Sequence, residues 1–325
     1  MKLLKLVPDD TNIRFLRWRV PFYAISVLLM AASLALVFTK GLNLGVDFIG
    51  GQMVRTTFTQ SAEAPVAELR EQIGALGYGE PIIQQFGKPN EVSIRMKLPA
   101  GAEDDPTLSD TMARRITATV RQQHPDARID GVDSVSGKVS GELFRTGMTA
   151  LIAAMIAISI YIWIRFEWQF GVGALFALAH DVTLTLGMFA LTGMEFDLNI
   201  VAAILTLIGY SLNDNIVVYD RVRENLRKYR KMPLPELLDL SVNETLSRTV
   251  VTSTSLLITL VALLVLGPDV IFGFTAAITL GIFVGTYSSI YMSAPILIWL
   301  GVTSSSFVPQ ESRADAQDRK ARGEA

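Results

Sequence analysis

The segment 198–218 reads LNIVAAILTLIGYSLNDNIVV, and it decides the fold. A helix rises about 1.5 Å per residue and about 20 apolar residues cross a bilayer, so this segment is long enough to span a membrane. Five further apolar stretches of similar length lie at 20–38, 146–164, 170–191, 249–266 and 271–300. The sequence therefore predicts a polytopic α-helical membrane protein with six transmembrane helices.

The composition agrees with a membrane protein. Of the 325 residues, 50% are hydrophobic and 18% are charged, whereas globular proteins carry about 25% charged residues. The mean hydropathy is +0.38. The net charge of −2 argues against nucleic acid as a partner. The absence of cysteine excludes disulfides, thiolate metal sites and a cysteine nucleophile, and with only two histidines no metal or cofactor is predicted.

Lysine and arginine near the span ends predict the orientation. They precede the first span, fill the loop between the fourth and fifth spans, and recur in the tail, whereas the connections 192–197 and 267–270 carry none. We therefore expect a cytoplasmic N-terminus (1–19), a cytoplasmic loop (220–247) and a disordered cytoplasmic tail (301–325). The first span, 20–39, is too long for a cleavable signal peptide and is interpreted as an anchor.

The region 40–142, between the first and second spans, has the pattern of a folded domain. Strand-like runs and two helical segments follow one another in the order β-α-β-β-α-β. This order is typical of a ferredoxin-like unit. The sequence thus predicts an α+β domain on the outer side of the membrane, inserted between helices 1 and 2, with the remaining five spans in 143–300.

Ionisable residues inside spans are costly and usually face a cavity or a partner. Asp214 lies within the fourth span, and Ser211 shares its helical face three residues earlier. His180 and Asp181 lie near the middle of the third span. Asp214 is interpreted as functional, whereas His180 and Asp181 fit either a functional role or a lock between two spans.

A polar stripe is predicted on the fifth span. Arg248, Thr252, Ser255 and Thr259 follow one another at helical spacing, and Ser241 to Glu244 resembles a capping box, so that Arg248 would lie inside the helix. The stripe can equally be packing glue, and Arg248 can snorkel to the headgroups. In a plain hairpin the expected neighbour of Arg248 is Asp220 rather than Asp214.

Three further patterns are less specific. Gly281 and Gly285 form a GxxxG pattern that permits close helix approach. The basic segment 223–231 is a topology determinant that can also contact membrane lipid. The phosphate-loop, HExxH and GxSxG motifs are absent, so we expect a protein that is not an enzyme.

Two motifs resemble the SecD/SecF family of protein-export membrane proteins. The segment 45–51 (GVDFIGG), with Gly45, Asp47, Gly50 and Gly51, is similar to the signature that opens the family's first external domain. The segment 209–225 (GYSLNDNIVVYDRVREN) resembles the fourth-span motif of the SecF branch and contains Asn213, Asp220 and Arg221. Asn215 and Tyr219 depart mildly from that motif, in which threonine and phenylalanine are expected.

The resemblance implies a subunit of the bacterial inner membrane that pairs with SecD and assists export of unfolded preproteins through the SecYEG channel. YajC is a further candidate partner. The proton gradient would supply the energy, and the resemblance places Asp214 and Arg248 in the proton pathway, with His180 and Asp181 at matching positions.

Two alternatives are a non-conducting membrane scaffold and half of a proton-coupled small-molecule exporter; six spans and one external domain make only half of such a transporter. We expect the external domain to be a mechanical and docking element without catalytic chemistry. Its joins, 41–51 and 136–142, would transmit motion, and the glycines of the first join suit either a hinge or a tight packing turn.

Overall fold

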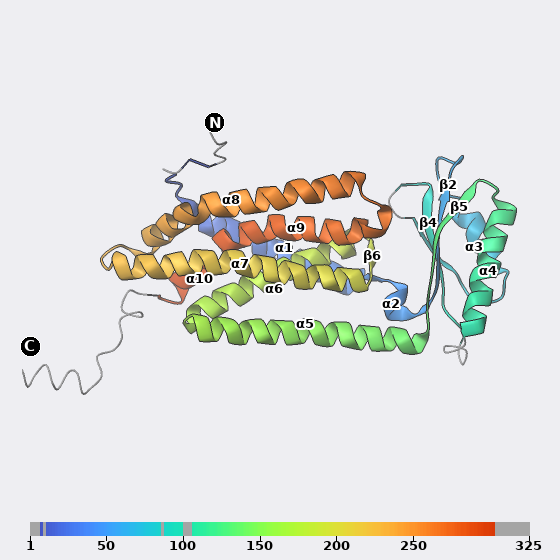
Figure 1. Ribbon diagram of the computed structural model, residues 1–325, viewed down its shortest axis with the longest axis horizontal. Coiled ribbons are helices and arrows are strands. Elements are labelled where there is room, and N and C mark those ends of the chain that lie inside the picture. Colours follow the sequence, from blue (N-terminus) through green and yellow to red (C-terminus); the bar gives the residue numbers. More distant parts are fainter. Residues whose placement is uncertain (1–6, 9–10, 86–87, 100–105, 303–325) are drawn as a thin grey trace, which may run out of the picture.

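The computed structural model describes residues 7–8, 11–85, 88–99 and 106–302, and it consists of a helical bundle with a small αβ domain at one end (Figure 1). Within these residues, six helical stretches are long and apolar enough to cross a membrane, as predicted. They are η1 (Phe15–Trp18) with α1 (Arg19–Thr39), α5 (Gly137–Arg165), α6 (Trp168–Thr192), α7 (Leu198–Lys228), α8 (Leu234–Leu266), and α9 (Phe272–Ser288) continued by η3 (Ser289–Ser293) and α10 (Ala294–Trp299). The predicted disordered tail lies, from residue 303 on, outside the described residues.

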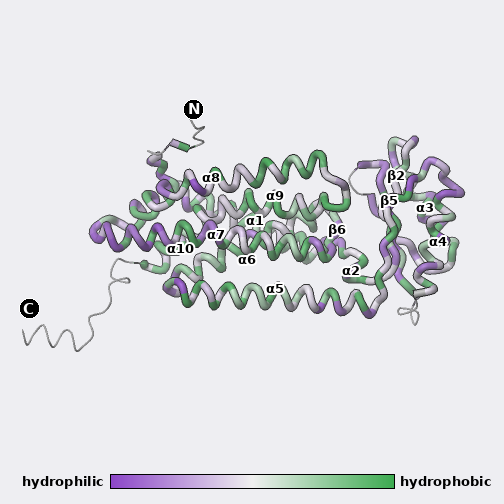
Figure 2. Tube along the Cα trace, in the orientation of Figure 1, coloured by the Kyte–Doolittle hydropathy of each residue, from purple (hydrophilic) through white to green (hydrophobic). Residues whose placement is uncertain are grey.

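Three of the six spans form the interior of the bundle. Half or more of the span residues are buried in α6, α7 and the α9–α10 span, but only 11% are buried in α1, α5 and α8. The inner helices supply most of the apolar core of the bundle, and the outer helices expose apolar side chains. Figure 2 shows that hydrophobic residues recur along α5 and α8. This distribution is that of helices immersed in lipid, where exposed apolar surface carries no penalty.

The last span is interrupted by one π-helical turn, η3, between α9 and α10. Pro295 follows directly after it in the first turn of α10. Proline has no N–H, and its ring clashes with the carbonyl four residues earlier, so the helix has to widen before it. The wide turn begins next to Ser288, a residue of the polar site described below.

The inserted αβ domain contains a four-stranded sheet with the order β3-β4-β2-β5, in which every neighbouring pair is antiparallel. Its elements are β2 (Gly51–Phe58), α3 (Val66–Gly74), β3 (Ile82–Gln85), β4 (Glu91–Met96), α4 (Pro106–Gln123) and β5 (Ala127–Val135). The predicted element order β-α-β-β-α-β is therefore present. A short strand, β1 (Asn43–Leu44), and a short helix, α2 (Val46–Ile49), connect α1 to β2.

The two faces of this sheet have different partners because side chains alternate along a strand. Val54, Val92 and Ile94 point to one face and pack with the buried side chains of α3 and α4. Arg95 and Ser93 of β4 are buried on the opposite face. That opposite face meets the end of the bundle, so a buried arginine lies at the junction between the two parts.

The GxxxG pattern of the sixth span is used inside the chain. A Cβ added at Gly281 would lie 2.4 Å from Cδ1 of Leu207 on α7, and one at Gly285 would lie 3.3 Å from Cβ of Ser211. Glycine at both positions therefore lets α9 approach α7 closely. The pattern marks an internal helix contact and needs no second chain to explain it.

The glycines at the first join form a packed turn. Gly50 (φ +68°) and Gly51 (φ +107°) occupy backbone conformations that side chains disfavour. A Cβ at Gly51 would lie 2.3 Å from the carbonyl oxygen of Met96, and one at Gly50 would lie 3.1 Å from Cα of Gly137, at the start of α5. The two predicted joins thus touch each other, a geometry that favours the packing turn over the hinge.

Replacing Gly51 with alanine should destabilise the αβ domain by at least about 3 kcal/mol, because strain and a backbone clash add together. Gly77→Ala is the matched control, since Gly77 also has a positive φ (+80°) but faces open space. It should cost only about 1–2 kcal/mol. Hydrogen–deuterium exchange of strands β2 and β4 in the intact protein measures the difference. Equal exchange in the two variants would contradict the packed turn.

Candidate functional site

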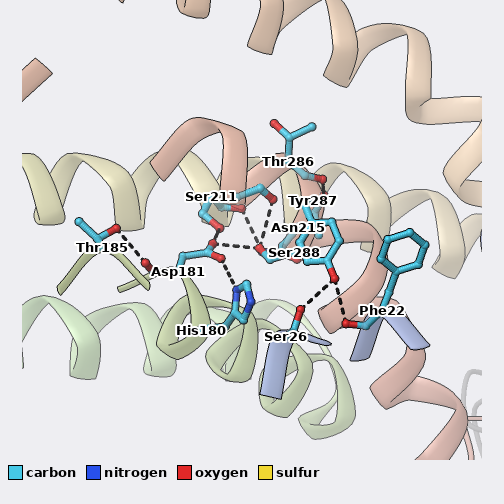
Figure 3. A network of polar contacts seen from close by, with 12 residues as sticks. Phe22, Ser26, His180, Asp181, Thr185, Ser211, Asn215, Thr286, Tyr287 and Ser288 are labelled. Atoms are coloured by element: carbon cyan, nitrogen blue, oxygen red, sulfur yellow. Dashed lines mark hydrogen bonds and ion pairs between the residues drawn. The ribbon is translucent and has the colours of Figure 1, made fainter. Parts of the chain in front are cut away.

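A polar cluster in the middle of the bundle is centred on Asp181 of α6. Its Oδ2 accepts hydrogen bonds from the hydroxyls of Ser211 on α7 (2.6 Å) and Ser288 on α9 (2.9 Å). Its Oδ1 lies 2.9 Å from Nδ1 of His180. One carboxylate therefore joins all three inner helices, and Figure 3 shows its partners converging on it from different directions.

Asp181 is fully buried and has a full set of partners, which identifies it as a structural hub. Burying a carboxylate is tolerated only when hydrogen bonds replace its lost hydration. The neighbouring His180 is also fully buried, and its Nε2 has no hydrogen-bond partner among the described residues. Tyr287, whose ring packs near that imidazole, bonds to Ser26 (2.9 Å) and thereby ties α1 to the cluster.

Asp214 differs from Asp181 although both are buried carboxylates. It lies one turn beyond Ser211 on α7 and is 3% exposed. The Ser211 hydroxyl, predicted to share its face, donates to Asp181 instead. Within the described part of the chain, Oδ2 of Asp214 is buried and accepts no hydrogen bond. A buried polar atom without a partner is costly, so this carboxylate differs from the hydrogen-bonded carboxylate of Asp181.

Arg248 of α8 lies level with Asp214 in the antiparallel hairpin of α7 and α8. The two residues are equally far from residue 231, which is midway between the end of α7 and the start of α8. Side-chain contacts between these helices bracket that level, at Arg221–Glu244 (2.7 Å) on one side and Tyr210–Ser253 (2.9 Å) on the other. The guanidinium is near enough to interact electrostatically with Asp214, but no hydrogen bond or ion pair joins them among the described residues.

The prediction that Asp220 is the neighbour of Arg248 was wrong. The hairpin is centred near residue 231, whereas a pairing of Asp220 with Arg248 would need it centred on residue 234, so the turn comes earlier in the chain than the prediction assumed. Asp220 pairs with Arg165 at the end of α5 instead (2.9 Å). Arg248 does lie well inside its helix, as the capping-box pattern indicated.

The polar stripe of α8 is present but faces outward. Thr252 and Thr259 donate to carbonyl oxygens of their own helix, those of Arg248 and Ser255 (3.0 and 3.2 Å). All four residues of the stripe are exposed on the surface of the chain. Ser253, beside the stripe, contacts the inner helices, since its hydroxyl bonds to Tyr210 and Thr286 (2.9 and 2.8 Å). Within the stripe, Thr252 also interacts with the hydroxyl of Tyr210.

Most other residues of the fourth-span motif contact neighbouring parts of the bundle. Asn215 is buried and donates to the carbonyl of Ser211 (3.0 Å), whereas Asn213 is exposed on the outer face of α7. Arg221 bridges Glu224 and Glu244 (2.7 Å each), fixing the cytoplasmic ends predicted for α7 and α8 to each other. Tyr219 fills the core against Phe166 and Phe170.

Comparison with known proteins identifies the family. The model of the SecD/SecF protein export membrane protein C-terminal region matches residues 115–303, and the model of the SecD/SecF GG motif matches residues 35–62. The protein translocase subunit SecF of Cereibacter sphaeroides is 46% identical over 304 residues, which cover 92% of this chain and 93% of that protein. The chain belongs to the SecD/SecF family. Its function is that of an auxiliary subunit of Sec-dependent protein export.

Other SecD/SecF proteins agree with this. SecF of Rickettsia bellii is 40% identical over 295 residues, covering 90% of this chain and 95% of the relative. The crystal structure of SecDF, a translocon-associated membrane protein from Thermus thermophilus, superposes with a TM-score of 0.79 at 35% identity over 91% of this chain. A super-membrane-facing form of SecDF gives 0.65 at 32% identity over 97%. The chain spans only 39% and 40% of those two proteins.

The GG motif of the SecD/SecF family lies at the junction between the αβ domain and the bundle. Asp47 accepts a hydrogen bond from the backbone N–H of Leu198 (3.0 Å), the first residue of α7. Asp197 accepts from Ile200 (3.1 Å) in the same helix turn. Two carboxylates therefore cap the helix that carries Asp214, where the helix dipole favours negative charge. The motif joins the αβ domain directly to the fourth span.

Arg95 is the residue of this junction that sequence reasoning missed. From β4 it donates to the carbonyl of Leu44, to Oδ1 of Asn43 and to Oε1 of Gln84. Asn43 and Gln84 in turn donate to the carbonyl of Gly193, in the turn between α6 and α7 (2.8 and 3.0 Å). Parallel pairing of β1 with β6 (Glu195–Phe196) completes the contact. The strand reads EVSIRM, and its alternation places Arg95 on the face opposite Val92 and Ile94, which is the signal that could have indicated a buried polar partner.

Charge compensation holds this junction together. Burial raises the pKa of the Glu195 carboxyl, and the nearby Arg95 guanidinium opposes that shift. Burial likewise lowers the pKa of Arg95, and Glu195 opposes it. Each group therefore stabilises the charged form of the other at the base of the αβ domain.

Replacing Ser211 with alanine should destabilise the bundle by about 1–3 kcal/mol, because it removes one donor from a buried carboxylate. Ser255→Ala on the exposed stripe is the control and should change stability by less than about 0.5 kcal/mol. Thermal unfolding in detergent, followed by the fluorescence of the four tryptophans, all of which lie in the bundle, compares them. Equal melting temperatures would show that Asp181 is no structural hub.

Proposed function

We propose that this SecF-type chain pairs with SecD and uses the proton gradient to assist protein export, with Asp214 as its proton-carrying residue. The observation that supports this most directly is the buried Asp214 carboxylate, which has no hydrogen-bond partner in the described part of the chain and lies level with an arginine on the neighbouring helix. Asp181 is given the different task of holding α6, α7 and α9 together. Roles for Asp181 and His180 in the proton pathway remain predictions.

The exposed stripe of α8 supports a second membrane chain beside this one. An arginine and three hydroxyl residues on the surface of a spanning helix would otherwise face lipid, which is costly for the guanidinium. A partner helix placed there would enclose Arg248 together with Asp214. We infer that SecD occupies this surface and contributes the remaining groups of the proton path.

The αβ domain is proposed to be a ferredoxin-like periplasmic domain. Its fully antiparallel sheet and its element order support that classification. The excess of lysine and arginine at the opposite end of the bundle supports cytoplasmic termini and insertion in the inner membrane. In this orientation the domain faces the side on which exported chains emerge.

The proposed partners beyond SecD are the SecYEG channel, the translocating unfolded preprotein and YajC. The domain is proposed to act mechanically and by docking, so the chain is no enzyme in this proposal. A non-conducting scaffold is the competing function. The two functions differ at Asp214, since a scaffold tolerates a neutral residue of the same shape, whereas proton transfer requires the carboxyl group.

Asp214→Asn should fold and insert normally yet abolish gradient-dependent export, because an amide keeps the shape of the side chain but cannot carry the proton. Asp220→Asn on the same helix is the control, since Asp220 is exposed and pairs with Arg165. Export by proteoliposomes that also contain SecD, SecYEG and the motor ATPase is measured with and without a proton gradient. Normal gradient stimulation by Asp214→Asn would favour the scaffold.

Arg248→Lys should impair gradient-dependent export although it preserves the positive charge, because lysine lacks the planar fork of donors. The stripe variant Thr259→Val, farther along the exposed face, should export at the normal rate if the effect is specific to the guanidinium. The same export assay measures both variants. Full activity of Arg248→Lys would mean that position 248 needs only a positive charge.

A further inference from the structure

A cavity of about 520 Å³ lies at the end of the bundle opposite the αβ domain. It is formed by the turn between α5 and α6 and by the last turns of α7, whose hydrophilic end is visible in Figure 2. Four basic and two acidic residues line it: Arg165, Asp220, Arg223, Glu224, Arg227 and Lys228. This cavity is remote from Asp214 and plays no part in the proposed proton path.

The acidic residues of this cavity are already engaged. Asp220 pairs with Arg165 (2.9 Å), and Glu224 pairs with Arg221 (2.7 Å), which lies outside the lining. Arg227 and Lys228 form no ion pair in the part of the chain that the structure describes, and Glu244 acts on Lys228 only as a nearby charge. The cavity therefore has unneutralised positive charge on the side formed by the end of α7.

The framework of the cavity is rigid and leaves a donor unused. Arg223 extends to the α5–α6 turn, where it contacts Glu167 (3.8 Å) and the carbonyl of Arg165 (3.4 Å). Its Nε is buried and donates to no acceptor within the described residues. The guanidinium groups of Arg165 and Arg223 therefore each have a carboxylate partner, Asp220 and Glu167 respectively, and Arg223 keeps a free donor among the described residues.

Large apolar side chains exposed on the surface of the bundle lie close in sequence to the cavity residue Arg165. Trp163 and Ile164, next to Arg165, are 69% and 82% exposed, and Trp168 at the start of α6 is 53% exposed. Exposed tryptophans beside arginine are typical of the membrane–water interface, where the rings lie at headgroup depth. A ligand in this cavity would have its charged part among cations and any acyl chains against α5.

We propose that this cavity binds the phosphate of an anionic phospholipid headgroup. Basic pockets between transmembrane helices recognise such headgroups, and planar guanidinium groups match phosphate oxygens. A soluble phosphate would satisfy the cations but would leave the adjoining apolar surface unused. The bound lipid would fix the α5–α6 turn against the end of α7.

Native mass spectrometry of the full-length protein in detergent tests the proposal, with phosphatidylglycerol, phosphatidylcholine of the same acyl chains, and inorganic phosphate as probes. Phosphatidylglycerol should bind at least tenfold more tightly than phosphatidylcholine. The double variant Arg227→Gln/Lys228→Gln should lose about 30-fold in affinity for it, which corresponds to about 1 kcal/mol for each charge.

Arg230→Gln/Lys231→Gln is the matched control, because it removes the same charge from the same segment outside the cavity lining. It should change the affinity less than threefold, and the single variant Lys228→Gln should give an intermediate loss if the double variant unfolds. Equal losses in both double variants, or equal binding of the two lipids, would overturn the site. Displacement of phosphatidylglycerol by millimolar inorganic phosphate would assign the cavity to a soluble anion and overturn the lipid.

Discussion

The cost of burying a carboxylate among lipid-embedded helices governs the arrangement of this bundle. Asp181 meets that cost with three side-chain partners, two of them hydroxyls from other helices. Those hydroxyls reach it only because α9 approaches α7 along a surface of glycine, where Gly285 leaves room beside Ser211. Close packing and hydrogen bonding therefore depend on each other, and the three inner helices form one unit around the carboxyl group of Asp181.

Asp214 is buried in the same bundle, but its carboxylate has no hydrogen-bond partner among the described residues. Its helix is held on one side by the Asp181 cluster and at its end by Arg221 and its carboxylate partners, so the position of Asp214 is fixed although its side chain forms no hydrogen bond or ion pair with the described residues. A buried acid that is positioned but unbonded has a protonation equilibrium sensitive to small changes around it. Two aspartates in neighbouring spans therefore differ. Asp181 is hydrogen-bonded and holds the helices together, whereas Asp214 is not bound to another helix in this way.

The sequence predicted the spans, the inserted domain and the buried acids, because hydropathy and strand alternation are local properties. It did not predict that Ser211 would bond to Asp181 rather than face Asp214, since that depends on how α6 and α7 pack. The pairing of Asp220 with Arg165 was missed for a related reason, because helix ends beyond the apolar segments carry little hydropathy signal. Arg95 was missed because a single arginine within a strand does not indicate which face of the sheet another domain covers.

Because Asp47 caps the start of α7, a change in the tilt of this helix moves the segment that contains Asp47. Leu198 and Asp214 are separated by roughly 24 Å of continuous helix, so a tilt of about 5° around the level of Asp214 would displace the capped end by about 2 Å. The displaced end is bonded to the same short motif whose last glycine starts the sheet. A tilt of α7 would therefore reach the αβ domain as a translation of the segment that leads into its first strand.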